Sequence, residues 1–411
     1  MTPQILSFLM KLRRLEAQIN ISKWADYSFK DSLTALRILA SRTSTAITNV
    51  ETSESLSPVV RNQILRDVNF HIMRSTYIIG VITRSNSIRN PFEMYTPFLR
   101  ICKSLLDENA NLILSSEWQY IPFTHPQNLS ELPSFVVIGM PASESDNVLV
   151  FPVAGHELGH SVWQKLDVRK SISNACSNHN DIIFSERRDK IEVAFPDIKN
   201  ADFDQDMFVQ YIKSTVFNSA LAQLEEYFSD FIGLILFGEG YLHAFEYLIG
   251  PQLGGIRSSE YPEIKDRTKI LESYANKIGI AVSHYSDRFL PDQPPKSPQD
   301  LILQLADAVT NVMIKDVFEI ASDHVMHQVA TDKLVLPSLA ATEAALGAFE
   351  RGIPYEGKAT IGDLINAAWK RFNLQALKPF VKYNGNRRIE DELADLVMKS
   401  VEMQELRDYK P

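Results

Sequence analysis

The sequence is poor in cysteine, because only Cys102 and Cys176 among its 411 residues carry a thiol. Two cysteines cannot build the disulfide framework of a small secreted protein, nor a zinc site made of thiolates. Such sparse cysteine usage is typical of proteins in a reducing compartment. We therefore expect a cytoplasmic location.

The sequence also lacks a long apolar segment. Its most apolar run covers residues 231–237, far short of the roughly 20 residues that a helix needs to cross a bilayer. A shorter apolar stretch at 5–10 is followed, rather than preceded, by Lys11, Arg13 and Arg14. This order is the reverse of that in a secretory signal peptide. We therefore expect neither an export signal nor a membrane partner.

An excess of positive charge is missing as well. The chain has 42 Lys and Arg against 51 Asp and Glu, a formal net charge of −9, which argues against general binding to nucleic acid. Hydrophobic residues make up 45% and charged residues 23%, which is enough apolar content for packed cores throughout. At roughly 100–200 residues per domain, the length allows two or three domains. The oligomeric state stays open.

The N-terminal region, residues 1–120, is expected to be mostly helical. Its first apolar residues recur at helical spacing. Ser57 with Pro58, and Thr96 with Pro97, predict two helix starts, since a capping hydroxyl followed by proline suits the first turn of a helix.

Strands are expected after this region. Short runs at 118–123 and 135–140 are rich in aromatic and β-branched residues, which is typical of strands. A helix is expected from about Pro152 onward. The predicted fold class is therefore α+β and predominantly α-helical, with a small β-sheet preceding this helix and helical regions on both sides.

Two breaks in the pattern suggest the remaining boundaries. We interpret the polar stretch 165–206 as an inserted subdomain or a lid. Four prolines within 290–298 predict an extended linker. The resulting division is an N-terminal helical region at 1–120, a core at 121–290 and a C-terminal helical region at 299–411.

One segment of this core carries a metal-binding pattern. Residues 153–163 read VAGHELGHSVW, which places His156, Glu157 and His160 in the spacing HExxH. Residues four apart lie on one face of a helix, so the two imidazoles can bind one zinc ion. Glu157 lies beside that face, where a carboxylate can take a proton from a water whose pKa zinc lowers to about 7. The sequence therefore predicts one zinc ion per chain.

A second acidic pattern follows on a later apolar helix. Glu226 and Asp230 are four residues apart and share a face. Glu226 can be the third zinc ligand, and Asp230 can accept the second N–H of a zinc-binding histidine and so fix its tautomer. Glu225 is the rival third ligand, but no Asp stands four residues after it.

HExxH followed by Glu-x-x-Ser-Asp resembles the gluzincin metallopeptidases, the thermolysin-like clan. The resemblance implies that His156, His160 and Glu226 are the zinc ligands. It also implies that Glu157 is the general base and that Asp230 orients a histidine. The third histidine of the metzincins is absent from the residues that follow His160.

Residues 259–267 read SEYPEIKDR and are similar to a motif of the HtpX and CAAX-prenyl protease group. That group has Thr-His-Pro followed by an arginine, whereas this chain has Tyr261 in place of the histidine. A tyrosine hydroxyl can donate to an oxyanion, so the resemblance implies Tyr261 as a catalytic donor and Arg267 as the partner of an acid on the Glu226 helix. A turn tyrosine and a surface arginine are the alternatives. Because the group's membrane helices are missing, the likeness covers only the core, residues 134–270.

The implied function is a zinc metallopeptidase that hydrolyses peptide bonds of a protein or peptide substrate through a zinc-bound water. The strand at 135–140 is the expected sheet edge for the substrate. We interpret other candidate oxyanion donors, His243, Tyr227 and the pair His284 and Tyr285, as structural residues. The alternative function is a catalytically silent zinc-binding scaffold or sensor with the same core.

Overall fold

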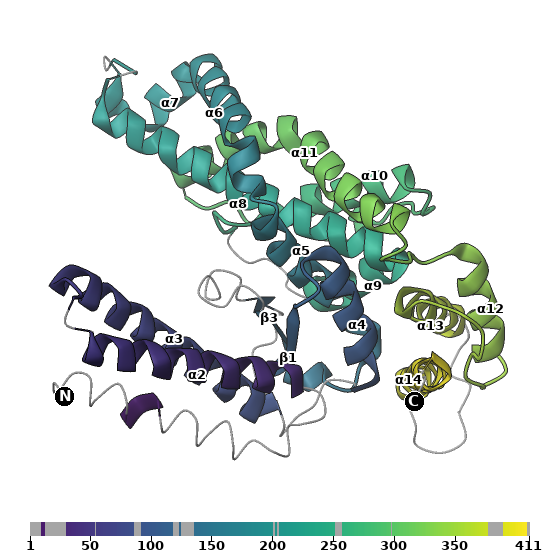
Figure 1. Ribbon diagram of the computed structural model, residues 1–411. Coiled ribbons are helices and arrows are strands. Elements are labelled where there is room, and N and C mark those ends of the chain that lie inside the picture. The colour runs from purple at the N-terminus through teal and green to yellow at the C-terminus, as the bar shows by residue number, and fades with distance from the viewer. Residues whose placement is uncertain are drawn as a thin grey trace. The chain divides into compact units, whose positions relative to one another are not determined.

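The chain forms two compact units, Met1–Asn147 and Val148–Pro411. Figure 1 shows the elements of each unit in the computed structural model. The residues that the structure describes are 10–12, 30–53, 55–85, 92–117, 123–124, 135–199, 202–203, 205–250, 257–296, 298–376 and 389–408.

The first unit combines long helices with one small sheet. Its elements are α2 (Lys30–Thr52), α3 (Pro58–Ser85), α4 (Phe92–Leu105), β1 (Asn111–Glu117), β2 (Phe123–Thr124), β3 (Phe135–Pro141) and the 3₁₀ turn η3 (Ala142–Glu144). Helices α2 and α3 pack together through apolar side chains that recur at helical spacing, among them Leu33, Leu36 and Ile47 on α2 and Val68 and Ile79 on α3.

The predicted start of α3 is confirmed. The helix begins at Pro58, and the Ser57 hydroxyl accepts a hydrogen bond from the Val60 N–H at 3.4 Å. Of the helical pattern predicted at the extreme N-terminus, only residues 10–12 lie within the described part of the chain, and these are helical.

The predicted helix start at Thr96 is wrong. Helix α4 begins at Phe92 and contains Pro97 in its interior. A proline inside a helix removes one backbone hydrogen bond, but Met94 and Phe98 on either side are completely buried. The packing of these side chains outweighs the missing hydrogen bond. A capping rule based on local sequence does not take such packing into account.

Strand β3 lies in the centre of a three-stranded sheet with the order β1-β3-β2. It is parallel to β1 along its whole length and antiparallel to β2, which pairs with Ile138 and Gly139. All seven residues of β3 are buried, as expected for an apolar strand within a parallel pair. The predicted strand at 135–140 is confirmed, but the prediction that it offers a free edge is wrong where β2 pairs with it. Most of the strand predicted at 118–123 lies outside the described residues.

The second unit is built from helices and short 3₁₀ turns. Its elements are η4 (Val148–Val150), α5 (Val153–Lys165), α6 (Val168–Glu186), α7 (Arg188–Ala194), η5 (Pro196–Ile198), α8 (Met207–Phe237), α9 (Glu239–Ile249), α10 (Ile264–Lys277), η6 (Ser286–Arg288), α11 (Gln299–Ala330), α12 (Leu339–Phe349), α13 (Ile361–Ala376) and α14 (Ile389–Asp408). The chain is thus α+β and predominantly helical, with a small sheet that precedes the HExxH helix in sequence, which confirms the predicted fold class. None of the described helices is long and apolar enough to cross a membrane.

Helix α8 is the central element of the second unit. The Asp206 side chain caps its first turn by accepting from the N–H groups of Phe208 and Val209 at 2.9 and 3.1 Å. Almost every residue of its second half is buried, which is the pattern of a helix surrounded by others. Helices α5, α6 and α11 all pack against it (Figure 1).

The stretch predicted as an insertion or lid, 165–206, contains α6 and α7 and packs on the first half of α8. The Asn180 side chain donates to the Lys213 carbonyl at 3.0 Å, and the Lys213 ammonium pairs with Asp181 at 3.2 Å. At about 1.5 Å per residue, Lys213 lies roughly 20 Å along the helix axis from Glu226. These contacts make α6 a helical layer on the first half of α8.

The predicted linker at 290–298 leads directly into α11, which packs along α8. The Thr310 hydroxyl donates to the Gln223 side chain at 2.9 Å, and the rings of Phe231 and Phe318 lie edge to face with centroids 5.2 Å apart. The predicted C-terminal region therefore shares a core with the helix that carries Glu226.

The boundary between the two units falls inside the predicted core at 121–290, between Asn147 and Val148. The pairing of β1 with β3 explains this position, because it attaches the strand before the HExxH helix to the first unit. The three predicted regions thus do not coincide with the two units.

Candidate metal centre

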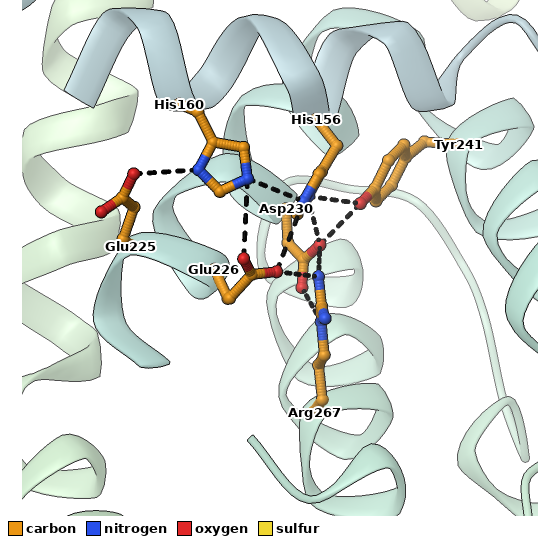
Figure 2. A network of polar contacts seen from close by, with 7 residues as sticks. All are labelled: His156, His160, Glu225, Glu226, Asp230, Tyr241 and Arg267. Carbon is orange, nitrogen blue, oxygen red and sulfur yellow. Dashed lines mark hydrogen bonds and ion pairs between the residues drawn. The ribbon is translucent and has the colours of Figure 1, made fainter. Parts of the chain in front are cut away.

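The HExxH residues lie on α5, a helix that begins directly after Pro152. His156 and Glu157 are buried, with 8% and 5% of their surface exposed, and His160 is partly buried. The two imidazoles project from the same face of the helix toward α8 (Figure 2). The spacing rule used for the sequence therefore holds in the structure.

Two glycines allow α5 to approach α8 closely. A Cβ atom added to Gly159 would lie 2.5 Å from the Ser229 Cα, and one added to Gly155 would lie 2.9 Å from the Phe237 ring. Real Cβ atoms essentially never come within 3.0 Å of such neighbours. The close approach carries Glu226 and Asp230 of α8 to the two histidines.

Three side chains converge on one point between the helices. The Nε2 atoms of His156 and His160 are 3.3 Å apart, and the Glu226 carboxylate oxygens lie 3.4 Å from the first and 3.6 Å from the second. One ligand atom from each residue lies within 4.8 Å of the others, so this group could hold a metal ion. Among the described residues it is the only such group of three.

Carboxylates set the tautomers of both imidazoles. His156 Nδ1 lies 2.9 Å from Asp230 Oδ1, and His160 Nδ1 lies 3.0 Å from Glu225 Oε1. A carboxylate accepts but does not donate, so each Nδ1 carries a proton and Nε2 is the ring atom of each histidine that can bind a metal ion. Both Nε2 atoms face the Glu226 carboxylate, so a bound cation would be attracted to the carboxylate and take the place of any proton on Nε2.

The Glu226 carboxylate has one oxygen atom that is free to bind a metal ion. Its Oε2 atom is buried and has no hydrogen bond, although the Arg267 guanidinium lies 3.1 Å away in poor geometry for one. A buried carboxylate oxygen without a hydrogen bond is costly. The residues present therefore fit a metal ion that this oxygen would contact.

Asp230 is the most heavily bonded acid of the centre. Arg267 binds it through two hydrogen bonds, Nε to Oδ2 at 2.7 Å and an η nitrogen to Oδ1 at 2.8 Å. The Tyr241 hydroxyl donates to Oδ1 at 2.6 Å and lies 3.4 Å from His156 Nδ1. Figure 2 shows these residues as one network around the histidines. Asp230 is completely buried, so this bonding compensates the loss of its hydration.

Neighbouring charges dominate the pKa values of the centre. Burial would raise the pKa of Glu226, but Arg267 and the two histidines lower it to about 2. Burial likewise opposes ionisation of Asp230, yet Arg267 and His156 hold its pKa far below the usual range. Burial lowers the pKa of His156, but Asp230 and Glu226 outweigh this effect and raise it to about 10, so a metal ion would displace a proton from Nε2. Both acids are therefore ionised at neutral pH.

Glu157 differs from these acids. It is buried, has no hydrogen bond to another described residue, and its pKa is raised by burial, although the nearby histidines partly oppose the shift. A carboxylate with a raised pKa beside a candidate metal site is suited to take up and release a proton.

Tyr261 lies at the exposed edge of the centre. Its side chain is 45% exposed, and its pKa is raised mainly by the Glu226 charge, with burial and Glu157 adding to the effect. The phenol is thus within electrostatic range of both carboxylates and stays protonated. It forms no hydrogen bond with another described residue.

The structure brings the predicted ligands and their partners together. The predicted contact of Arg267 with acids on the Glu226 helix is present. Glu225 forms a hydrogen bond with Nδ1 of His160 and is not one of the three candidate ligands. Tyr241 was not foreseen. The sequence signal for the turn that brings Tyr241 back to the centre is Gly238, which lies between α8 and α9.

Three of the other candidate donors have structural contacts. The Tyr285 hydroxyl is buried and donates to the Leu242 carbonyl at 2.8 Å. His243 contacts the Asn373 amide at 3.2 Å, and Tyr227 is buried. These contacts agree with their interpretation as structural residues.

No protein-family model, curated protein or solved structure matches this chain. The case for the centre therefore rests on its own geometry.

The glycine contact predicts that Gly159→Ala destabilises the protein. The added methyl group meets the α8 backbone, so we expect the free energy of unfolding to fall by about 1–3 kcal/mol, although alanine is the better helix former. Denaturant titration measures the change. Gly347→Ala on α12 is the matched control, because its Cβ would meet only the Arg351 side chain at 3.8 Å. Equal stability of the two variants would contradict the close contact.

The geometry also predicts which acid is the third ligand. Glu226→Ala should abolish stoichiometric metal binding, since one of three ligands is lost. Glu225→Ala should retain the metal with an affinity about 10- to 100-fold lower, the usual loss for a residue that orients a ligand. Elemental analysis and chelator competition measure both. Full metal content in Glu226→Ala, with loss in Glu225→Ala, would reverse the assignment.

Proposed function

We propose that the protein is a cytoplasmic zinc metallopeptidase that hydrolyses peptide bonds of a protein or peptide substrate. His156, His160 and Glu226 would hold one zinc ion per chain. The observation that carries the proposal is the convergence of two imidazole nitrogens and a carboxylate beside the buried Glu157. A site with a purely structural metal has no need of Glu157, an acid that is not among the ligands.

Zinc is the ion that suits this donor set. Two imidazoles and one carboxylate are the ligands of catalytic zinc in several metallopeptidases, in which the fourth position is left for water or substrate. When bound, zinc acts as a Lewis acid on the scissile carbonyl and lowers the pKa of a bound water to about 7. The resemblance to the gluzincins supports this choice.

Glu157 would act as the general base and then as the general acid. Its carboxylate takes a proton from the attacking water and passes it to the leaving amine. The raised pKa favours the second step, because the protonated carboxyl must persist until the amine departs. Tyr261 would donate a hydrogen bond to the oxyanion of the tetrahedral intermediate, for which its phenol must remain protonated.

The assignment to the cytoplasm rests on the cysteines. Cys102 and Cys176 are both free and buried, and unpaired thiols are typical of reducing compartments. This part of the proposal is independent of the reaction.

Glu157→Gln tests the proposed reaction most simply. It keeps the shape and removes the base, so cleavage of a peptide library, read by mass spectrometry, should fall by about 100-fold or more. Zinc content should not change. Glu319→Gln, an exposed residue on α11, is the control and should match the wild type.

Two outcomes of that experiment count against the mechanism. Cleavage that survives in Glu157→Gln means that Glu157 is not the base. A zinc-loaded wild type that cleaves no member of the library favours the silent scaffold or sensor.

Tyr261→Phe tests the oxyanion donor. Loss of one such donor costs about 100-fold or more in kcat. Zinc affinity should change little, because the hydroxyl forms no hydrogen bond with the zinc ligands, and KM should change little if the hydroxyl binds only the oxyanion. Steady-state kinetics on the library peptide that is cleaved fastest measure kcat and KM. An unchanged kcat would make Tyr261 an ordinary turn residue.

A further inference from the structure

Helix α9 lacks a cap of its own. Gly238 ends α8 with a φ of +61°, stands at the N-cap position of α9 and has no side chain to offer. The first N–H groups of a helix have no partner within it. One of them, the Gly240 N–H, instead donates to the Asn366 side chain of α13 at 2.6 Å, across 126 residues of sequence.

Asn366 fits this position closely. It is 7% exposed, and a Cβ atom added to Gly240 would lie 2.8 Å from its Oδ1. One turn further along α13, the Trp369 indole donates to the Leu149 carbonyl at 2.9 Å. Helix α13 thus contacts both segments that adjoin the metal centre, the start of α9 and the turn η4 before α5.

The start of α9 carries Tyr241. Its N–H donates to the Gly238 carbonyl at 3.1 Å, and its ring fills the space where a Cβ of Gly233 would lie, 2.5 Å away. From there its hydroxyl reaches Asp230 at 2.6 Å, and Asp230 accepts from His156 Nδ1 at 2.9 Å (Figure 2). The cap on Gly240 is therefore one residue from the side chain that holds the acid behind His156.

We propose that Asn366 is a positioning residue for the metal centre. By capping α9 it keeps the Tyr241 hydroxyl on Asp230, and Asp230 in turn fixes the orientation of the His156 imidazole. The C-terminal helices are then part of the metal centre instead of an accessory region. The inference rests on the proposed metal site but not on the reaction that the site performs.

Asn366→Ala tests the proposal through the metal itself. Zinc affinity, measured by chelator competition well below the melting temperature, should fall by up to about tenfold, the lower end of the loss expected for outer partners of a ligand. The visible absorption spectrum of the cobalt(II)-substituted protein should also change, because the ligand field follows the orientation of His156. A purely structural role would lower the melting temperature and leave both readouts unchanged.

Two further variants on the same helix sharpen this comparison. The single substitution Asn366→Asp should keep the zinc affinity of the wild type. A carboxylate also accepts from the Gly240 N–H, and a negative charge is favourable at a helix N-terminus. Asn373→Ala is the matched control. It removes an asparagine that joins α13 to α9 through His243, away from Tyr241, and should leave zinc affinity and the cobalt spectrum unchanged.

A double-mutant cycle tests whether Asn366 acts through Tyr241. Tyr241→Phe should weaken zinc binding by about tenfold. If the proposal is correct, adding Asn366→Ala to Tyr241→Phe has no further effect. Additive losses would overturn it, as would wild-type affinity and spectrum in Asn366→Ala alone.

Gly240→Ala covers the case in which Asn366→Ala does not fold. Alanine is the better helix former, but its methyl group displaces the Asn366 amide, so zinc affinity should fall in a folded protein. Unchanged affinity would again overturn the proposal. Absence of zinc binding in the wild type is a different result, because it refutes the proposed metal site itself.

Discussion

The contact between Gly159 on α5 and the Ser229 backbone on α8 sets the distance on which the candidate metal centre depends. The two helices can approach this closely only because no side chain separates them. At that separation Glu226 reaches both imidazoles and Asp230 reaches the Nδ1 of His156. A wider spacing would separate the two imidazoles from the carboxylates of α8, so the glycine serves packing and chemistry at once.

Charge balance is the second constraint on this centre. Four carboxylates, those of Glu157, Glu225, Glu226 and Asp230, gather around it, and Arg267 is the guanidinium that pairs with two of them. A divalent cation at the convergence of the ligand atoms would offset the remaining negative charge. Arg267 by contrast fixes geometry, because its planar fork binds Asp230 at two points.

Local spacing explains what could be predicted. Four-residue spacing places Glu226 and Asp230 on one face of a helix, so the group that could hold a metal ion was predicted from the sequence. Helical periodicity likewise predicted the predominantly helical fold class. The partner role of Glu225 was not predicted, since it depends on how α8 is rotated against α5. The position of Tyr241 depends on the direction that α9 takes after a turn. The contact of Asn366 depends on packing between residues 126 positions apart in the sequence. The prediction of a free sheet edge at β3 was wrong for the same reason, because strand order depends on tertiary structure.

X-ray absorption spectroscopy at the zinc edge tests the central claim most directly. The account predicts that protein loaded with one equivalent of zinc shows two imidazole nitrogens at about 2.0–2.1 Å, with oxygen at about 2.0–2.2 Å. It also predicts no sulfur, because the predicted ligand group contains neither Cys102 nor Cys176. A sulfur shell near 2.3 Å, or a shell of oxygen atoms without imidazole, would contradict the site of His156, His160 and Glu226.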